Sequence, residues 1–163
     1  MIVLTGAGQG FSSGADHKSA GSVPHIDGLT RPTFALRSME VLDEVILSLR
    51  KMHQPVIAAV NGAAIGGGLC LALACDIRVA GSGAYFRAAG INNGLTASEL
   101  GLSYLLPRAI GTSRAFELML TGRDVDADGA SAWCLGPCRK TSCLTFAVTS
   151  ASGSRRSPGR EPS

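Results

Sequence analysis

The sequence predicts an α/β domain with mainly parallel strand pairing, followed by an irregular tail. Short apolar runs typical of buried strands alternate with longer segments whose apolar residues recur at helical spacing. Glycine-rich loops separate these segments, at residues 6–18 and 61–69. After about residue 128 both periodicities stop, and the chain becomes rich in Ser, Gly, Pro and Arg. Strands that alternate with helices favour layered packing and a parallel sheet. We therefore expect a core at 1–128 and a disordered tail at 129–163.

The first elements are a strand, a long helix and a second strand. "MIVLTG" is a short apolar strand at the very start, and a lone strand cannot bury itself, so we expect a partner strand region to be missing upstream. A helix is predicted from Phe34 to Met52, because residues 39, 42, 45, 46, 49 and 52 form an apolar stripe with charges beside it. Pro55 ends this helix, and "PVIAAV" follows as a buried strand.

The later elements repeat this alternation. "GGGLCLALAC" predicts a turn into a short apolar helix, "IRVA" predicts a strand, and "GSG" turns the chain into "AYFRAAG". "TASELGLSYLLPRAIG" predicts one helix, with Thr96 and Glu99 in the spacing of a capping box. "TSRAFELML" predicts another, which begins at Thr112 or Ser113 and ends at Gly122.

Charge is distributed unevenly along the chain of 163 residues, whose net charge is +3. From residue 139 onward five basic residues and one acidic residue carry +4, which leaves −1 for the remainder. A basic tail can contact nucleic acid. No aromatic residue lies among Arg155, Arg156 and Arg160 to stack on bases, so we interpret the tail as a solvated chain end and expect no nucleic-acid partner.

The five cysteines and the N-terminus favour a cytoplasmic protein with reduced thiols. The count is odd, and the first residues lack the basic segment and long apolar run of an export signal. Cys134, Cys138 and Cys143 lack CxxC spacing, so no metal is expected. Residues 56–75 carry no charge over a membrane-spanning length, but Asn61 and four glycines favour a buried strand, turn and helix instead.

The first glycine loop does not match a nucleotide-binding motif. Gly6, Gly8 and Gly10 resemble the start of a dinucleotide fingerprint, but Phe11 follows and no helix comes directly after it. The chain also lacks the Gly-Lys-Ser/Thr of a Walker motif. A dinucleotide-binding module therefore stays a minor alternative.

The second glycine loop has a stronger chemical interpretation. A glycine turn that opens a helix exposes unpaired N–H groups at the positive end of the helix dipole. Two such donors from different loops form an oxyanion hole. Gly67 can supply one donor, and the "SSGAD" loop around Ala15 can supply the other. The alternative is that these glycines only permit tight packing.

Three segments resemble the enoyl-CoA hydratase/isomerase (crotonase) family. They are "IVLTGAGQGFSSGADHK", "PVIAAVNGAAIGGGLCLALACDIRVA" and "GLSYLLPRAIGTSRAFELMLTGR", and the resemblance covers about residues 1 to 128. It implies a ββα spiral that forms trimers, often paired into hexamers, and an acyl-CoA thioester ligand from fatty-acid metabolism. Coenzyme A would be part of the substrate, with no separate cofactor and no membrane partner.

The resemblance also implies roles for particular residues. The N–H groups of Ala15 and Gly67 would hold the thioester oxygen, where negative charge gathers as an enolate forms. The stretch Ala15, Asp16, His17 and Lys18 would line the CoA arm, and Gly66, Gly67 and Gly68 would line the substrate. His17, beside Ala15, is also a candidate catalytic group, and Asp76 is expected to have a structural role.

The chain departs from the hydratase pattern at both catalytic carboxylates. Hydratases of the family carry two glutamates that position water and move protons, and the matching places here are Cys70 and Gly90. Water addition by that route is therefore not expected. Glu99 lies just after the second lost position and is a candidate acid for the same pocket, although it can instead cap Thr96. Relatives with altered carboxylates perform isomerisation, hydrolysis or C–C cleavage.

These observations leave several hypotheses about function. The chain can be an acyl-CoA enzyme, a non-catalytic acyl-CoA-binding protein or partner subunit, or an inactive truncated fragment. The family has further segments before and after the matched part, so we expect truncation at both ends. "DVDADGASAWCLGPCRK" begins like the family and then becomes unrelated, which favours translation in a shifted frame.

Overall fold

The strands form two three-stranded sheets in the computed structural model, which describes residues 1–16, 28, 30–96 and 98–132. The first sheet has the order β1-β2-β4, and both of its pairs are parallel. Its strands are Ile2–Thr5, Val56–Val60 and Ile77–Ala80. The second has the order β3-β5-β6, parallel and then antiparallel. Its strands are Ala63–Ile65, Tyr85–Arg87 and Asp124–Asp126. The predicted α/β class with mainly parallel pairing is confirmed.

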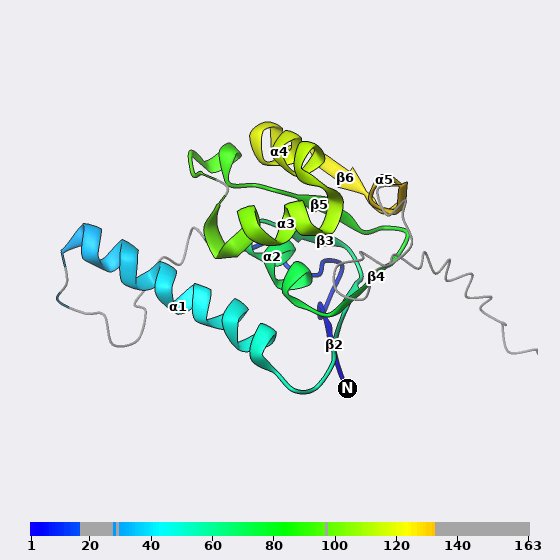
Figure 1. Cartoon of the computed structure of the whole chain (residues 1–163), viewed down its shortest axis with the longest axis horizontal. Helices are drawn as coiled ribbons and strands as arrows, with labels where there is room; N and C mark the ends of the chain where they lie inside the picture. The colour runs from blue at the N-terminus through cyan, green and yellow to red at the C-terminus, as the bar shows by residue number, and fades with distance from the viewer. Residues whose placement is uncertain (17–27, 29, 97, 133–163) are drawn as a thin grey trace, which may run out of the picture.

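Successive turns of the chain place one strand in each sheet and then add a helix (Figure 1). β2 and β3 precede α2 (Gly67–Ala74), and β4 and β5 precede α3 (Leu102–Ile110). An earlier turn has the same plan, because β1 is followed by Ser12, which bridges in parallel to Ala64 of β3, and then by α1 (Arg31–Lys51). The ββα spiral implied by the resemblance is therefore confirmed.

Three predicted boundaries differ from the structure. Helix α1 begins at Arg31 and ends at Lys51, where Phe34 and Met52 were expected. The single helix expected from Thr96 is instead a 3₁₀ turn, η2 (Glu99–Gly101), followed by α3. Leu100 has φ 54° and ψ 30°, a left-handed conformation that cannot continue a right-handed helix. Helix α5 (Ala127–Ala132) crosses the expected core boundary at 128, so residues 129–132 are helical. The rest of the expected tail, and the three cysteines within it, lie outside the described residues.

The remaining elements follow the predicted order. α4 (Thr112–Thr121) begins at the expected threonine and ends at Gly122, which has φ 61°. A 3₁₀ turn, η1 (Ile91–Asn93), follows β5. Strand β1 lies at an edge of its sheet, where Val3 is 56% exposed. In the described part of the chain, no helix is both long and apolar enough to cross a bilayer.

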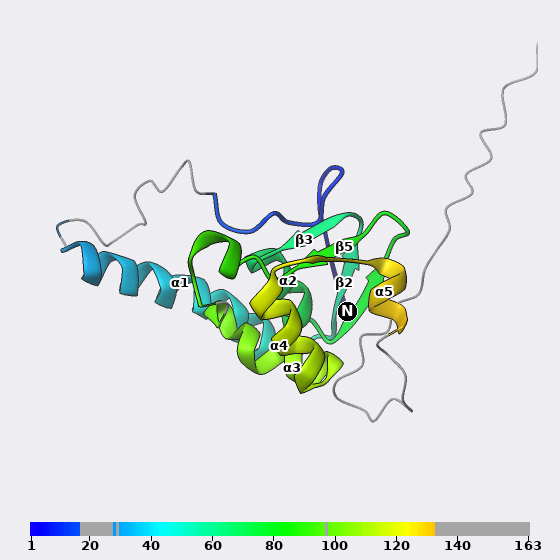
Figure 2. The ribbon, with the colours of Figure 1, turned by 90° about the horizontal axis from the view of Figure 1, so that it is seen from above.

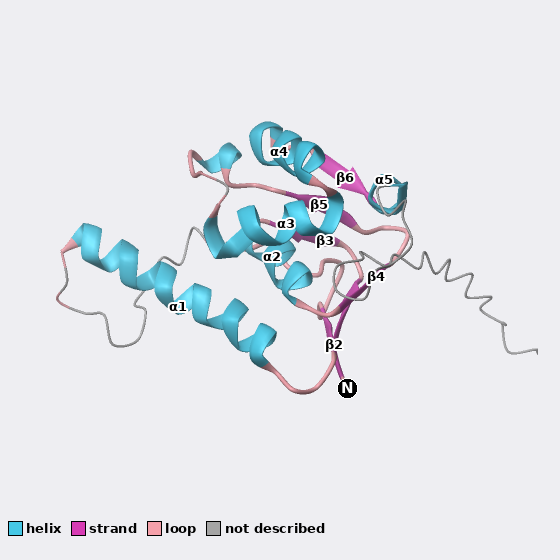
Figure 3. Cartoon of the chain, viewed as in Figure 1, coloured by secondary structure: helices cyan, strands magenta, loops and turns pink. Residues whose placement is uncertain are grey.

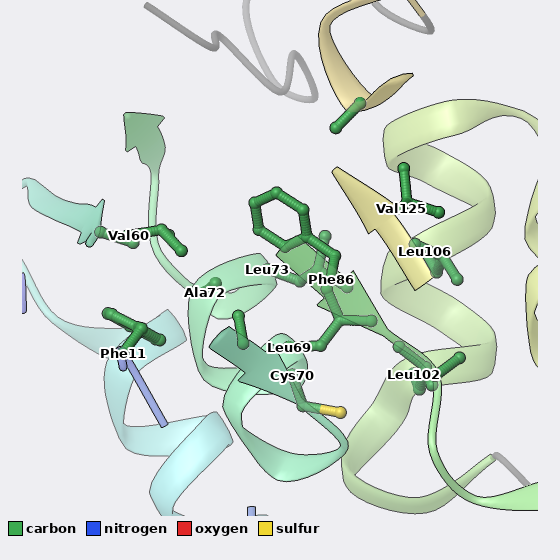
Figure 4. Close-up of a cluster of buried hydrophobic side chains, with 14 of the residues drawn as sticks. Phe11, Val60, Leu69, Cys70, Ala72, Leu73, Phe86, Leu102, Leu106 and Val125 are labelled. Atoms are coloured by element: carbon green, nitrogen blue, oxygen red, sulfur yellow. The ribbon is translucent and has the colours of Figure 1, made fainter. Parts of the chain in front are cut away.

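The core surrounds α2, which is apolar on all sides and is therefore buried. Figure 4 shows side chains of α2 gathered with Phe86 of β5, Leu102 and Leu106 of α3, and Val125 of β6. Helix α1 behaves differently, since it reaches away from both sheets (Figures 2 and 3). Ile46 is its one fully buried side chain among those that the structure describes. Much of the apolar stripe of α1 is therefore exposed.

Candidate active site

Ala15 and Gly67 occupy equivalent places in adjacent turns of the spiral. Ser12 pairs with Ala64, and each candidate amide follows its paired residue by three positions. The Ser12 N–H donates to the Ala63 carbonyl at 2.9 Å, and the Ile65 N–H donates to the Ser12 carbonyl at 2.9 Å. Parallel neighbours lie about 4.8 Å apart and run in the same direction, so both bends emerge at the same end of the sheet.

Gly66 turns the chain from β3 into α2. Its backbone has φ 53° and ψ −115°, which a residue with a side chain rarely adopts. Its N–H donates to the carbonyl of Arg87 at 3.0 Å, and its carbonyl accepts the N–H of Cys70 at 3.1 Å. The first of these bonds attaches the start of α2 to β5, and the second belongs to the first turn of the helix.

The next two glycines bring the two bends into contact. A Cβ atom on Gly68 would overlap the carbonyl oxygen of Ser12 and lie 2.8 Å from the Ser12 Cβ. A Cβ atom on Gly14 would lie 3.3 Å from the Gly67 nitrogen. Gly67 is the first residue of α2, so its N–H has no partner within the helix. The glycines therefore serve close backbone packing, the alternative raised above, and also leave a helix-end donor beside the Gly14–Ala15 bend.

A cavity of about 290 Å³ opens at this meeting point. Its walls come from the 12–15 bend, one side of α1, the start of α2 and segment 89–102. Ala15, Gly66, Gly67 and Glu99 all line it. Cys70 and Gly90, at the two positions where the resemblance implies glutamates, line it too.

The other predicted site residues lie elsewhere. Gly68 is buried against Ser12 and is not among the cavity-lining residues, and neither is Asp16. His17 and Lys18 lie outside the described residues, so their predicted roles stay predictions. Asp76 accepts a hydrogen bond from the Val56 N–H at 2.8 Å, as its predicted structural role requires.

The Cys70 thiol keeps its proton over the ordinary pH range. Burial raises its pKa from 9.0 to about 12, and the charge of nearby Glu99 adds to this effect. Its sulfur lies 3.8 Å from the Glu99 carbonyl oxygen, as a weak donor. A protonated thiol is not a base, so position 70 offers no substitute for a carboxylate.

Glu99 has a structural partner as well as a place in the cavity wall. Its Oε1 accepts hydrogen bonds from the Thr96 N–H at 2.9 Å and from the Thr96 hydroxyl at 2.8 Å. The bond to the Thr96 N–H has the form of one half of a capping box, but η2 begins at Glu99 after Ser98, so the expected helix cap at Thr96 is wrong. In the described part of the chain, Glu99 is the only acidic residue among those that line the cavity.

Several cavity residues were not predicted from the sequence. Leu100 is the only non-glycine residue with positive φ in the part of the chain that the structure describes, and its side chain faces Gly67 closely enough that a Cβ there would lie 3.2 Å from Leu100 Cδ1. Strained backbone of this kind often occurs at functional sites. Met39 and Leu42 of α1 also line the cavity, and the apolar stripe was the signal that could have indicated them.

We expect Cys70 and Cys75 to resist alkylation in the folded chain. Burial raises the pKa of Cys75 to about 11, so near neutral pH both thiols are protonated and shielded. Mass spectrometry of peptides after iodoacetamide treatment should find both unmodified in buffer and modified in concentrated urea. Rapid labelling of Cys70 in buffer would contradict this burial.

The same two pKa shifts predict how stability depends on pH. The folded state retains protons that the unfolded state releases above pH 9.0, so the stabilisation is complete below that pH. It decreases as pH rises through the range from 9.0 to about 11 and beyond. Urea unfolding midpoints measured across this range should fall in the native chain, and fall less in a Cys70→Ala/Cys75→Ala variant.

The fold and the cavity define a class of protein, a ββα-spiral protein in which Ala15 and Gly67 of adjacent turns line one pocket. A sequence profile of the enoyl-CoA hydratase/isomerase family matches residues 1–136, so the chain belongs to that family. The match continues past residue 128, where the sequence resemblance was expected to end.

Individual relatives agree with this assignment. A probable enoyl-CoA hydratase of Mycobacterium bovis is 83% identical over 130 residues, which cover 80% of this chain and 46% of that protein. A crystal structure of a probable enoyl-CoA hydratase/isomerase from Mycobacterium abscessus superposes with a TM-score of 0.77 at 70% identity, over 90% of this chain and 50% of the other. A monofunctional enoyl CoA isomerase from M. smegmatis superposes with a TM-score of 0.60 at 66% identity, over 80% and 50%. The chain spans about half the length of the curated relatives it matches.

Proposed function

We propose that this chain binds an acyl-CoA thioester and polarises its carbonyl between the N–H groups of Ala15 and Gly67. The observation that carries the proposal is the register of the spiral, which brings both residues to the wall of one cavity. Backbone donors held at the end of a helix stabilise the negative charge of an enolate oxygen. Little free energy is needed to reorganise these donors during the reaction, because the glycine contacts already hold them in place.

The reaction that best fits the cavity is double-bond isomerisation. Water addition needs one group to activate water and another to deliver a proton, and positions 70 and 90 hold a protonated thiol and no side chain. Isomerisation needs only one base. Glu99 takes a proton from the carbon between the thioester carbonyl and the double bond, and the resulting dienolate is stabilised by the two amides. The same carboxyl group returns the proton two carbons further along the acyl chain.

The similarity to a protein described as a monofunctional enoyl CoA isomerase supports this proposal. The second candidate is binding without turnover, as a carrier or as a partner subunit. The hydrogen bonds that tie Glu99 to Thr96 favour that candidate. If the native chain binds a thioester but does not isomerise it, this second candidate is the better function.

A matched pair of ligands tests the thioester site. Crotonyl-CoA presents a carbonyl oxygen, and the S-butyl thioether of CoA does not. Two hydrogen bonds at about 0.5–1.5 kcal/mol each predict that the thioether binds roughly 5- to 150-fold more weakly. Equal affinities, measured by isothermal titration calorimetry, would exclude the oxyanion site.

We also expect no measurable hydration of crotonyl-CoA by the native chain. The absorbance of the conjugated enoyl thioester should stay constant, while a 3-enoyl-CoA should gain that absorbance as it isomerises. Clear loss of crotonyl-CoA would show that water addition does not depend on carboxylates at positions 70 and 90.

A further inference from the structure

Arg78 of β4 is a buried cation close to α2. It is 4% exposed, and it is the only buried charged residue in the part of the chain whose burial the structure describes. Removing a guanidinium from water is costly unless its donors are satisfied. The hydrogen-bond partners of Arg78 therefore indicate which part of the fold this buried charge stabilises.

Among those partners are the last carbonyl groups of α2. Arg78 Nη1 donates to the carbonyls of Ala72 and Leu73 at 3.3 Å and to that of Cys75 at 2.7 Å. Cys75, the C-cap residue, has an extended backbone, so α2 lacks the left-handed cap that often satisfies these groups. A positive charge at this end also complements the helix dipole. Arg78 thus replaces the usual cap and fixes the C-terminal end of α2.

Arg78 also belongs to the sheet that carries the other candidate donor. It pairs with Ala58 of β2, and Ala58 pairs with Leu4 of β1. The chain continues from β1 into the 12–15 bend, which holds Ala15. The Arg78 side chain therefore connects α2, which begins at Gly67, to the sheet whose strand β1 leads into the bend that holds Ala15.

Because α2 is short, fixing its C-terminal end also fixes the position of its N-terminal end. Eight residues at 1.5 Å each make α2 about 12 Å long, and a helix of this length moves as a rigid unit. At its N-terminal end the contact of Gly68 with Ser12 leaves no room to move inward. A helix released at its C-terminus can slide or tilt outward, which moves Gly67 relative to Ala15.

We propose that Arg78 is a positioning residue that sets the distance between the two thioester-binding amides by holding the C-terminus of α2. This inference rests on the proposed function. It goes further, since it assigns the geometry of the site to a buried side chain at the opposite end of the helix.

The test compares Arg78→Lys and Arg78→Met with a control, Arg108→Met. Arg108 is an exposed arginine of α3 that bonds to the Tyr104 carbonyl and covers its ring, away from the cavity. Each folded variant is titrated with cinnamoyl-CoA, whose absorbance shifts to longer wavelength when its thioester carbonyl is polarised, and with CoA alone. Circular dichroism establishes folding.

We expect folded Arg78→Lys to lose about tenfold in affinity for cinnamoyl-CoA and to show a smaller absorbance shift, with CoA affinity unchanged. Arg78→Met should lose more, and Arg108→Met should match the native chain. An unchanged shift in folded Arg78→Lys would overturn the inference, and so would failure of this variant to fold, because Arg78 would then serve the fold alone. Absence of a shift in the native chain would instead refute the proposed thioester site.

Discussion

A Gly68→Ala variant is expected to be less stable by about 3 kcal/mol, the upper part of the range for overpacking a tight core. The added methyl group would overlap the Ser12 carbonyl oxygen, which belongs to the backbone and cannot rotate away. Relief requires α2 to move from the 12–15 bend. Thioester affinity should therefore fall together with the urea unfolding midpoint.

Gly83→Ala is the matched control for this substitution. A Cβ atom on Gly83 would have no neighbour within 4 Å, and Gly83 is not among the positive-φ glycines. Its effect on the free energy of unfolding should stay within about 0.5 kcal/mol. Similar unfolding midpoints for the two variants would contradict the close contact between α2 and Ser12.

The Glu99→Gln variant is expected to slow isomerisation by about a hundredfold or more, the usual range for loss of a general base. The amide keeps an oxygen that accepts the bonds from Thr96, so the local turn should survive. Deuterium exchange at the carbon next to the thioester carbonyl, followed by mass spectrometry, measures proton transfer directly. Thioester affinity should change little.

Thr96→Val separates the structural role of Glu99 from its chemical one. This variant removes the hydroxyl group that donates to Glu99 Oε1. It keeps the Glu99 carboxylate and the backbone N–H of residue 96. If Glu99 moves protons, exchange should stay within about tenfold of the native rate, far above that of Glu99→Gln. Equally rapid exchange in the native chain and Glu99→Gln would exclude Glu99 as the base, and no exchange in either would leave binding without turnover as the better function.

Thiols illustrate what a sequence leaves undecided about chemistry. A thiol with no base beside it ordinarily titrates near ~8.5, and the sequence places no such base next to Cys70. The structure buries it to 1% exposure and raises its pKa to about 12. Its inability to act as a base thus follows from its surroundings, which involve Glu99, a residue 29 positions later in the chain.

Local pattern was sufficient for most elements of the fold. Apolar runs and helical spacing predicted β1, α1, β2, α2, β4 and α4, because each forms from neighbours in sequence. The break at Leu100 was missed, since "SELGLSYLL" has helical spacing throughout and a leucine in the left-handed region is not signalled by its residue type. β6 was missed for a similar reason, because its three residues are a strand only through pairing with β5.

The sequence by itself determined the α/β class, the family resemblance, the two glycine bends and the absence of carboxylates at positions 70 and 90. Only the tertiary structure decided that Ala15, Gly67 and Glu99 share one cavity, and that Arg78 holds the far end of α2. The physical reason is sequence separation. Residues 15 and 67 become neighbours only when Ser12 and Ala64 pair across the spiral, and such pairing depends on the packing of the whole core.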